Sequence, residues 1–331
     1  MKNLDCENLG RALVNDTKAI SPNWHTPVLA NQVTAALQPG PGMLFLDGTA
    51  GGGGHSRNLL EAGANVIALD QDPEALARCK ANLSAFGDRV RLVESNFRNA
   101  TQSLASIGIT GGLNGALLDI GVSSHQLDEA QRGFSLMREG PLDMRMGPTI
   151  AETAADIVNT RSVEELTSIF RLYGEEPNAR KIATAIVSRR NSKPFTTTLD
   201  LADTIAAVCP RSGPRHPATR IFQALRIEVN DELGALRQAL ATIPTLLAPG
   251  ARFAVITFHS LEDRIVKVFF KEHSLEWIDR PEWPKPRRNP LRQFRLVTRH
   301  PIVPCEQEVA ENPRARSAKL RVVEKLKEPA P

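Results

Sequence analysis

Short apolar runs alternate with stretches of helical periodicity over residues 43–119, and this alternation restricts the fold more than any other feature of the chain. The apolar runs predict buried strands over 43–47, 65–70, 90–94 and 115–119. Helices are expected between them over 56–62 and 73–85. Strands joined through helices in this way form a parallel sheet with helices on its faces. The sequence therefore predicts an α/β fold.

Helical periodicity dominates from about residue 149 to 247. Helices are expected over 162–172, 178–190 and 199–208, followed by a long helical stretch from Ala218. Apolar residues at spacings of three and four give this stretch a core-facing stripe, formed by Ile221, Leu225, Val229, Leu233, Leu236 and Leu240. Strand patterns return over 252–258, 294–298 and 319–323.

These changes of pattern predict an α/β domain that is interrupted by an all-helical insertion. The first part of the α/β domain covers 24–148, the insertion covers 149–247, and the second part, with a basic end, covers 248–331. Residues 1–23 form an N-terminal extension. Residues 284–290 are basic and proline-rich, and we expect them to form a loop.

The composition is that of a globular protein, because 41% of the 331 residues are hydrophobic and 24% are charged. No run approaches the ~20 apolar residues that a membrane span needs, and residues 1–23 lack the apolar core of a signal peptide. The four cysteines form no CxxC pair, and no tight cluster of metal ligands stands out. We expect a soluble, cytoplasmic protein with reduced cysteines and no metal. Its oligomeric state, a dimer included, stays open.

Positive charge is concentrated in two stretches. Residues 280–331 hold 13 Lys and Arg against 6 Asp and Glu, and residues 180–226 hold nine basic residues against two acidic ones. Such stretches favour a polyanionic partner over a small neutral substrate. The alternative is two solvated surfaces, since aromatic residues that could stack on bases are scarce in both stretches.

A glycine-rich loop follows the first predicted strand, with the sequence GTAGGGGHS over 48–56. Four consecutive glycines between a strand and a helix let the backbone approach a ligand at the positive end of the helix dipole. Asp70 ends the next strand, where a carboxylate can accept hydrogen bonds from both ribose hydroxyls of a nucleoside. Asp119 ends the fourth strand, in the crevice where open α/β sheets bind ligands. Together these features predict a cofactor that contains a nucleoside.

The spacing of the glycines distinguishes between nucleoside cofactors. Positions 51, 53 and 56 are Gly, Gly and Ser, which departs from the dinucleotide fingerprint G-x-G-x-x-G. The loop also lacks the lysine of a phosphate-binding P-loop. S-adenosylmethionine has no phosphate to bind, so it fits this loop better than NAD or ATP.

Seven segments resemble the bacterial 16S ribosomal RNA N4-cytidine methyltransferases, and they occur in that family's order from residue 24 onward. They are HTPVL (25–29), DGTAGGGGHS (47–56), DIGVSSHQLD (119–128), RGFS (132–135), GPLDMRM (140–146), YGEE (173–176) and FHSLEDR (258–264). The resemblance implies a class I (Rossmann-like) methyltransferase sheet with an inserted all-helical domain. It also implies methylation, with S-adenosylmethionine, of a cytidine in the decoding centre of 16S ribosomal RNA, a modification that fine-tunes the ribosomal P site.

The resemblance further implies which residues contact the cofactor. They are Gly53, Gly54, His55, Asp70, Phe97, Asp119 and Gln126. The glycines would admit the methionine portion, Asp70 would hold the ribose, and Phe97 would offer an apolar face to the adenine. Asp119 could attract the ammonium or the sulfonium, both of which are cationic. The alternative for His55 is a polar residue at a helix start. Without the resemblance, Phe97 is equally well explained as core packing.

The catalytic base is not identified by the sequence. Many amino-methyltransferases carry an (Asp/Asn/Ser)-Pro-Pro-aromatic motif after the fourth strand, whereas this chain has DIGVSS over 119–124. The candidates are Asp119, Asp143, Ser123 and His259. Asp143 and Ser123 could instead form supporting hydrogen bonds, and His259 could be a packed structural histidine.

Candidate RNA contacts lie in the basic part of the insertion. They are Arg180, Lys181, Arg189, Arg190, Lys193, Arg215 and Arg220. The partner implied by the resemblance is 16S ribosomal RNA, as naked RNA or in the small ribosomal subunit. Three alternatives remain: a class I methyltransferase for another RNA, a protein or a small molecule; a non-catalytic ribosome assembly factor that binds the cofactor; and, least favoured, an NAD-dependent enzyme.

Overall fold

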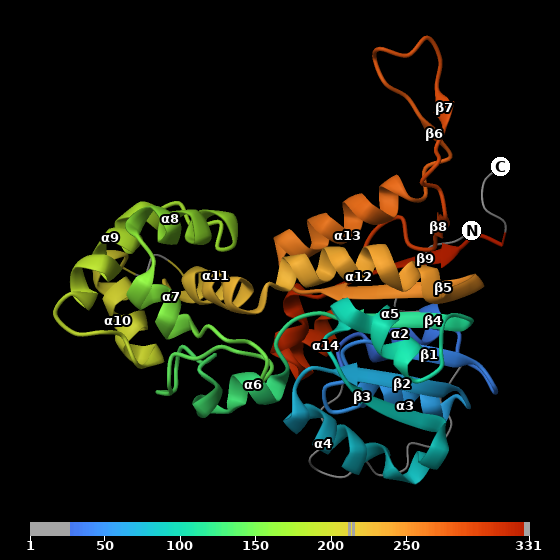
Figure 1. Ribbon diagram of the computed structural model, residues 1–331, viewed down its shortest axis with the longest axis horizontal. Coiled ribbons are helices and arrows are strands. Elements are labelled where there is room, and N and C mark those ends of the chain that lie inside the picture. Colours follow the sequence, from blue (N-terminus) through green and yellow to red (C-terminus); the bar gives the residue numbers. More distant parts are fainter. Residues whose placement is uncertain (1–26, 211–212, 214–215, 328–331) are drawn as a thin grey trace.

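The computed structural model describes residues 27–210, 213 and 216–327, and a seven-stranded sheet forms its centre (Figure 1). The strands are β1 (Leu44–Asp47), β2 (Asn65–Asp70), β3 (Val90–Glu94), β4 (Leu113–Asp119), β5 (Leu247–Thr257), β8 (Phe294–Leu296) and β9 (Lys319–Lys325). Their order is β3–β2–β1–β4–β5–β9–β8. β1 to β5 are parallel, and β9 runs antiparallel to both β5 and β8. The α/β prediction and the seven predicted strands are confirmed.

The order of the strands locates the binding crevice. From β1 the chain moves to β2 and β3 on one side, and β4 and β5 lie on the other side. Connections therefore leave β1 and β4 in opposite directions, which opens a crevice at the carboxyl ends of these two strands. Asp47 and Asp119 end β1 and β4 at this edge.

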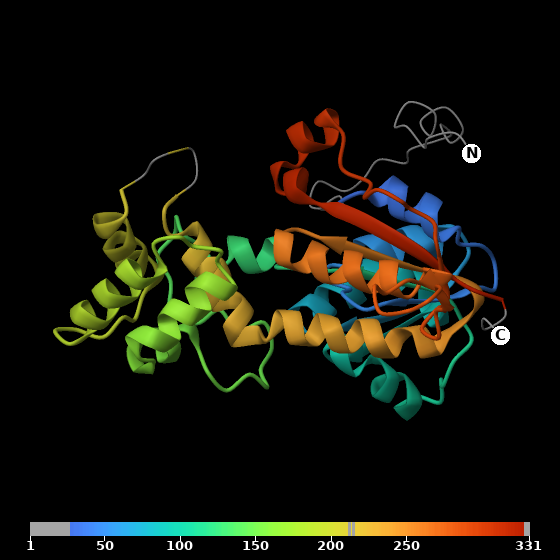
Figure 2. The same cartoon turned by 90° about the horizontal axis from the view of Figure 1, so that it is seen from above.

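Helices cover both faces of the sheet, as Figure 2 shows from above. They are α2 (Ala30–Leu37), α3 (Gly54–Glu61), α4 (Pro73–Leu83), α5 (Ala100–Ser106), α12 (Glu232–Leu246), α13 (Ser260–Glu272) and α14 (Glu306–Glu311). Shorter 3₁₀ turns are η1 (Ser84–Arg89), η2 (Phe97–Asn99), η3 (Ala130–Arg132) and η4 (Pro313–Ser317). α2, α3 and α4 pack in one apolar cluster, and α5, α12 and α13 pack in another.

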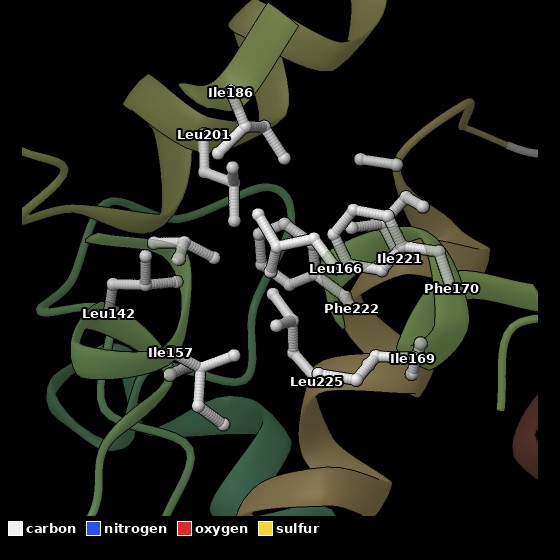
Figure 3. Packing of buried hydrophobic residues seen from close by; sticks show 14 of the residues in the cluster. Leu142, Ile157, Leu166, Ile169, Phe170, Ile186, Leu201, Ile221, Phe222 and Leu225 are labelled. Carbon is white, nitrogen blue, oxygen red and sulfur yellow. The ribbon is translucent and has the colours of Figure 1, made fainter. Parts of the chain in front are cut away.

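A group of helices beside the sheet packs around its own core. These helices are α7 (Ala154–Thr160), α8 (Val163–Leu172), α9 (Ala179–Arg190), α10 (Thr198–Val208) and α11 (Thr219–Asn230). Leu166, Phe170, Ile186 and Leu225 meet in the centre of this core (Figure 3). The short α6 (Ser124–Asp128) lies between the helical group and the sheet (Figure 1).

The long helical stretch predicted from Ala218 is divided into two helices, which corrects the prediction. Asp231 adopts a left-handed backbone conformation (φ 46°) and separates α11 from α12. The apolar stripe therefore faces two cores: Leu225 packs within the helical group, whereas Leu236 and Leu240 pack against the sheet. The insertion over 149–247 stays a proposal, and this packing favours a boundary at Asp231.

One buried side chain joins the two segments that connect the helical group to the sheet. Asn230 donates through Nδ2 to the carbonyl of Met144 (2.8 Å) and accepts through Oδ1 from the N–H of Met146 (2.8 Å). The segment that leads from the sheet into the helical group is thus held, at Asn230, to the segment that leads back to the sheet. Residues 1–23, predicted to be an extension, lie outside the described residues.

The proline-rich stretch over 284–290 is not simply a loop. It holds the strand β7 (Arg287–Arg288), which pairs in antiparallel fashion with β6 (Trp277–Ile278). The result is a two-stranded ribbon that projects from the sheet side of the molecule (Figure 1). Cys79, Cys209 and Cys305 are free thiols. Among the described residues, no helix is long and apolar enough to cross a bilayer.

Candidate active site

A cleft of about 660 Å³ lies where the carboxyl ends of the central strands face the helical group. One part of its wall, here called the cofactor end, holds the glycine-rich loop with Asp70, Phe97, Asp119 and Gln126. The other part, here called the insertion end, holds Arg226, Glu232 and His259. The cleft therefore brings together the residues that the sequence singled out for the cofactor and for catalysis, with the exceptions of Gly53 and Asp143, and among the described residues it includes none of the candidate RNA contacts.

The glycine-rich loop owes its shape to two backbone positions that favour glycine. Gly51 and Gly53 have φ angles of 52° and 87°, in the left-handed region. Gly53 comes directly before α3, and a Cβ atom there would lie 3.0 Å from the Sγ atom of Cys79. The loop can therefore pass close to α4 and leave its outer side open to the cleft.

Asp70 is held in place by backbone donors at the end of β2. Its Oδ2 accepts from the N–H of Gly51 (2.8 Å), and its Oδ1 accepts from the N–H of Asp72 (2.9 Å). Burial raises the pKa of the Asp70 carboxyl to about 6, although both hydrogen bonds act to lower it. The carboxylate is thus oriented toward the cleft before any ligand arrives.

Gln126 is fixed by a network that local sequence does not reveal. Ser123 and Gln126 form a capping box at the start of α6, and the Gln126 side chain also donates to Asp72 Oδ2 (3.0 Å). Arg132 donates to the same oxygen (2.7 Å). Burial would raise the pKa of Asp72, but the hydrogen bonds from Arg132 and Gln126 hold it below its usual value.

Asp119 and His55 offer uncommitted polar atoms to the cleft. The Asp119 N–H donates to Oγ1 of Thr49 in the glycine-rich loop (2.7 Å), which fixes the end of β4 against that loop. His55 Nε2 lies 3.5 Å from Asp119 Oδ2. Asp119 Oδ1 and both ring nitrogens of His55 are buried without a hydrogen-bond partner among the described residues. Buried polar atoms of this kind normally bind a ligand or water.

The insertion end holds a compact charged cluster, of which the sequence predicted only His259 as a site residue. Arg226 makes two hydrogen bonds to Glu232, at 2.7 and 2.9 Å, across the break between α11 and α12. His259 Nε2 lies 3.0 Å from Glu262 Oε1, although neither atom has a well-aligned hydrogen bond. Glu262 Oε2 accepts from the N–H groups of Phe258 and His259 (2.8 and 3.2 Å).

The same cluster has the spacing of metal ligands. Single ligand atoms of Glu232, His259 and Glu262 all lie within 4.8 Å of one another. However, both Glu232 oxygens already accept hydrogen bonds from Arg226. Burial would lower the pKa of Arg226, but the neighbouring Glu232 raises it above its usual value. The negative charge of Glu232 is thus balanced by the guanidinium of Arg226, which stays protonated.

The four candidate bases occupy different surroundings. Asp119 and His259 line the cleft, and His259 is also the N-cap of α13. Ser123 lines the cleft as the N-cap of α6. Asp143 is absent from the wall and accepts two hydrogen bonds from the Arg145 side chain, both at 2.8 Å. The geometry therefore favours Asp119 and His259 over Asp143.

Several of the candidate RNA contacts have partners within the protein. Arg190 donates to the carbonyls of Val158 and Arg161, both at 2.7 Å, and Arg189 bonds to Asp200. Four other candidates lie at the surface: Arg180, Lys181, Lys193 and Arg220. Arg180 lies 3.8 Å from Glu164, and Arg220 lies 3.8 Å from Glu176. Arg215 lies outside the described residues.

Comparison with known proteins adds the family. A model of the MraW methylase family matches residues 23–326. The chain belongs to this family. A relative from Heliobacterium modesticaldum is 50% identical, and the match covers 92% of this chain and 99% of the relative. A relative from Anaeromyxobacter sp. (strain K) is 52% identical, and the match covers 92% of this chain and 98% of the relative. Both are named ribosomal RNA small subunit methyltransferase H.

Membership of the MraW methylase family confirms the resemblance drawn from the seven segments, and with it the methyltransferase class. S-adenosylmethionine is the cofactor of this methylase. The cleft fits such a ligand, because its volume lies in the usual range for ligand sites. In addition, Asp119 Oδ1 is buried and accepts no hydrogen bond from residues 27–210, 213 or 216–327. The roles of individual residues stay predictions.

Proposed function

We propose that the protein methylates N4 of a cytidine in the decoding centre of 16S ribosomal RNA, next to the P site, in the cytoplasm. The observation that carries this proposal is the identity of about 50%, over nearly the whole chain, to proteins named for methylation of small-subunit ribosomal RNA. The cleft supports it, since a cofactor end and an insertion end face the same space.

At the cofactor end, each predicted contact has a physical role. Asp70, oriented by two N–H groups, accepts hydrogen bonds from the ribose hydroxyls. Gly54 leaves room for the methionine portion, and His55 closes that side of the cleft. Gly53 does not line the cleft, because its missing side chain would face Cys79 on α4, so its role is to let the loop pass close to that helix. Phe97 packs against the adenine. Asp119 attracts the cationic part of the cofactor.

The amino group of cytosine is a poor nucleophile, because its lone pair is delocalised into the ring. S-adenosylmethionine supplies a methyl group made electrophilic by its sulfonium. The residues of the cleft contribute orientation, which can supply several of the ~7–11 kcal/mol available from this effect. An acceptor oxygen such as Asp119 Oδ1, which has no hydrogen-bond partner among the residues described, can accept a hydrogen bond from the amino N–H and localise the lone pair.

The insertion end faces the base from the other side. His259 lines this end and is the candidate that takes the proton released from the amino group. Arg226 and Glu232 form a fixed donor and acceptor pair beside it. The target base has to leave its stack to enter the cleft, as in other enzymes that modify bases.

Transfer of a labelled methyl group to small ribosomal subunits tests the proposal directly. Subunits would come from cells in which the gene for this protein is deleted, so that the target is unmodified. Digestion to nucleosides should give labelled N4-methylcytidine. Label in another nucleoside or in protein would overturn the substrate assignment, and no transfer despite cofactor binding would favour a non-catalytic assembly factor.

A further inference from the structure

The β6–β7 ribbon, residues 277–288, extends beyond the rest of the sheet side of the molecule (Figure 1). Trp277 pairs with Arg288, and Ile278 pairs with Arg287. Apart from Ile278 and Trp283, every residue of the ribbon is exposed. An element that buries so little surface adds little to the stability of the core, so its sequence needs another explanation.

The base of the ribbon is firmly anchored. Asn289 is buried and donates through Nδ2 to the carbonyls of Glu272 (2.6 Å) and Leu275 (2.9 Å). Its backbone N–H donates to the carbonyl of Glu276 (3.0 Å). Prolines at 281, 284 and 286 limit the conformations of the tip. The ribbon is thus a defined projection with a fixed direction.

Arginines and tryptophans stack on one another along the ribbon. The guanidinium of Arg288 lies 5.7 Å from the ring centre of Trp277, and those of Arg280 and Arg287 lie 5.0 and 4.7 Å from that of Trp283. Trp277 is 51% exposed. The stacks hold flat aromatic and cationic groups ready at the surface, at little further cost in side-chain entropy.

The cations of the ribbon have no carboxylate partner in the part of the chain that the structure describes. Within the described residues, Arg280, Lys285, Arg287 and Arg288 form no ion pair. By contrast, Arg189 in the helical group is paired with Asp200. The ribbon therefore presents charge that remains available to an external anion.

We propose that the β6–β7 ribbon binds ribosomal RNA at a distance from the target cytidine. The guanidinium and ammonium groups contact phosphates, and the faces of Trp277 and Trp283 stack on unpaired bases. This inference rests on the proposed function, because it takes ribosomal RNA as the partner. It explains why an exposed and a half-buried tryptophan occur here beside arginines that form no ion pair among the described residues.

The position of the ribbon indicates the size of the substrate. α13 begins next to His259 at the cleft, and its 13 residues lead to the ribbon at the other end. With a rise of about 1.5 Å per residue, the two sites are on the order of 20 Å apart. A single nucleoside in the cleft cannot reach the ribbon, whereas a longer RNA, such as folded 16S ribosomal RNA, can.

Intrinsic fluorescence can report on the ribbon alone. The chain has three tryptophans, and two of them, Trp277 and Trp283, lie on the ribbon. In a Trp24→Phe variant all tryptophan emission comes from the ribbon. Titration with protein-free 16S ribosomal RNA should quench this emission, and added salt should restore it. No quenching, or equal quenching by vesicles of phosphatidylglycerol, would overturn the proposal.

Charge reversal on the ribbon provides the second test. In an Arg287→Glu/Arg288→Glu variant, affinity for 16S ribosomal RNA should fall at least tenfold. Loss of two phosphate contacts should also lower the slope of log affinity against log salt by about 1.5. A Lys80→Glu/Arg237→Glu variant makes the same change of charge at exposed positions on α4 and α12 and should behave as wild type. Equal losses in both variants would show a non-specific charge effect.

Methyl transfer separates this inference from the proposed function. The ribbon variant should bind S-adenosylmethionine as wild type does, with a raised KM for small subunits. If the wild-type protein methylates cytidine and the ribbon variant does so with the same KM, RNA binding by the ribbon would be refuted and the proposed function would stand. If RNA quenches the tryptophan emission but the wild-type protein transfers no methyl group, RNA binding by the ribbon would stand and the proposed function would be refuted.

Discussion

At the cofactor end of the cleft, backbone N–H groups orient the Asp70 carboxylate, whereas at the insertion end the charged side chains of Arg226 and Glu232 hold each other. Asp70 depends on two N–H groups from segments that follow β1 and β2. Arg226 and Glu232 depend on each other across a helix break. A site held by backbone survives the loss of one side chain more easily than a site held by paired charges. The two ends should therefore respond differently to mutation.

The largest effect is expected at the insertion end. An Arg226→Met substitution leaves the Glu232 carboxylate buried without its partner, which should lower the free energy of unfolding by about 3 kcal/mol. Thermal or urea denaturation measures this loss. The double variant Arg226→Met/Glu232→Leu should recover much of the stability. If the double variant were as unstable as the single one, the charge pair would not explain the effect.

An Asp70→Ala substitution should weaken binding of S-adenosylmethionine about 100-fold, because two hydrogen bonds to a charged group are lost. Isothermal titration calorimetry measures the change. Asp88→Ala removes an exposed carboxylate from the turn before β3 and is the matched control. The free energy of unfolding should change much less than in the Arg226 variant. Unchanged cofactor affinity would remove Asp70 from the binding site.

Cofactor affinity should also depend on pH. The pKa of Asp70 is raised to about 6, so the carboxylate that accepts ribose hydrogen bonds is present above pH 6 and becomes protonated below it. Affinity should therefore fall as the pH falls, by about tenfold at pH 5. In Asp70→Asn the affinity is lower and this dependence should disappear. A dependence that persists in the variant would assign it to another group.

The smallest effect is expected for Arg190→Ala. Its guanidinium donates to the carbonyls of Val158 and Arg161, so the loss should cost about 1–2 kcal/mol of stability. RNA affinity should change less than twofold, in contrast to the ribbon variant. Comparing denaturation with RNA binding in this variant tests whether arginines of the helical group act within the fold. A large loss of RNA affinity at normal stability would contradict this.

The cofactor end was largely predictable from the sequence, because its residues directly follow strands whose apolar patterns are clear. Gly51, Asp70 and Asp119 lie where the strand ends place them. At the insertion end only His259 was predicted, since Glu232 and Glu262 meet only through the packing of α12 and α13. The break at Asp231 was also missed, because an uninterrupted apolar stripe gives no sign of a change of core. The ribbon was missed because its two strands are only two residues long.

The division of the cleft into two ends is tested most directly by a His259→Asn variant, since asparagine keeps the N-cap of α13. The measurement compares its affinity for S-adenosylmethionine with its rate of methyl transfer to small ribosomal subunits. The cofactor affinity should stay within twofold of wild type, while the rate should fall about 100-fold, as for the loss of an acid–base group. A parallel loss of cofactor affinity, or an unchanged rate, would contradict the division.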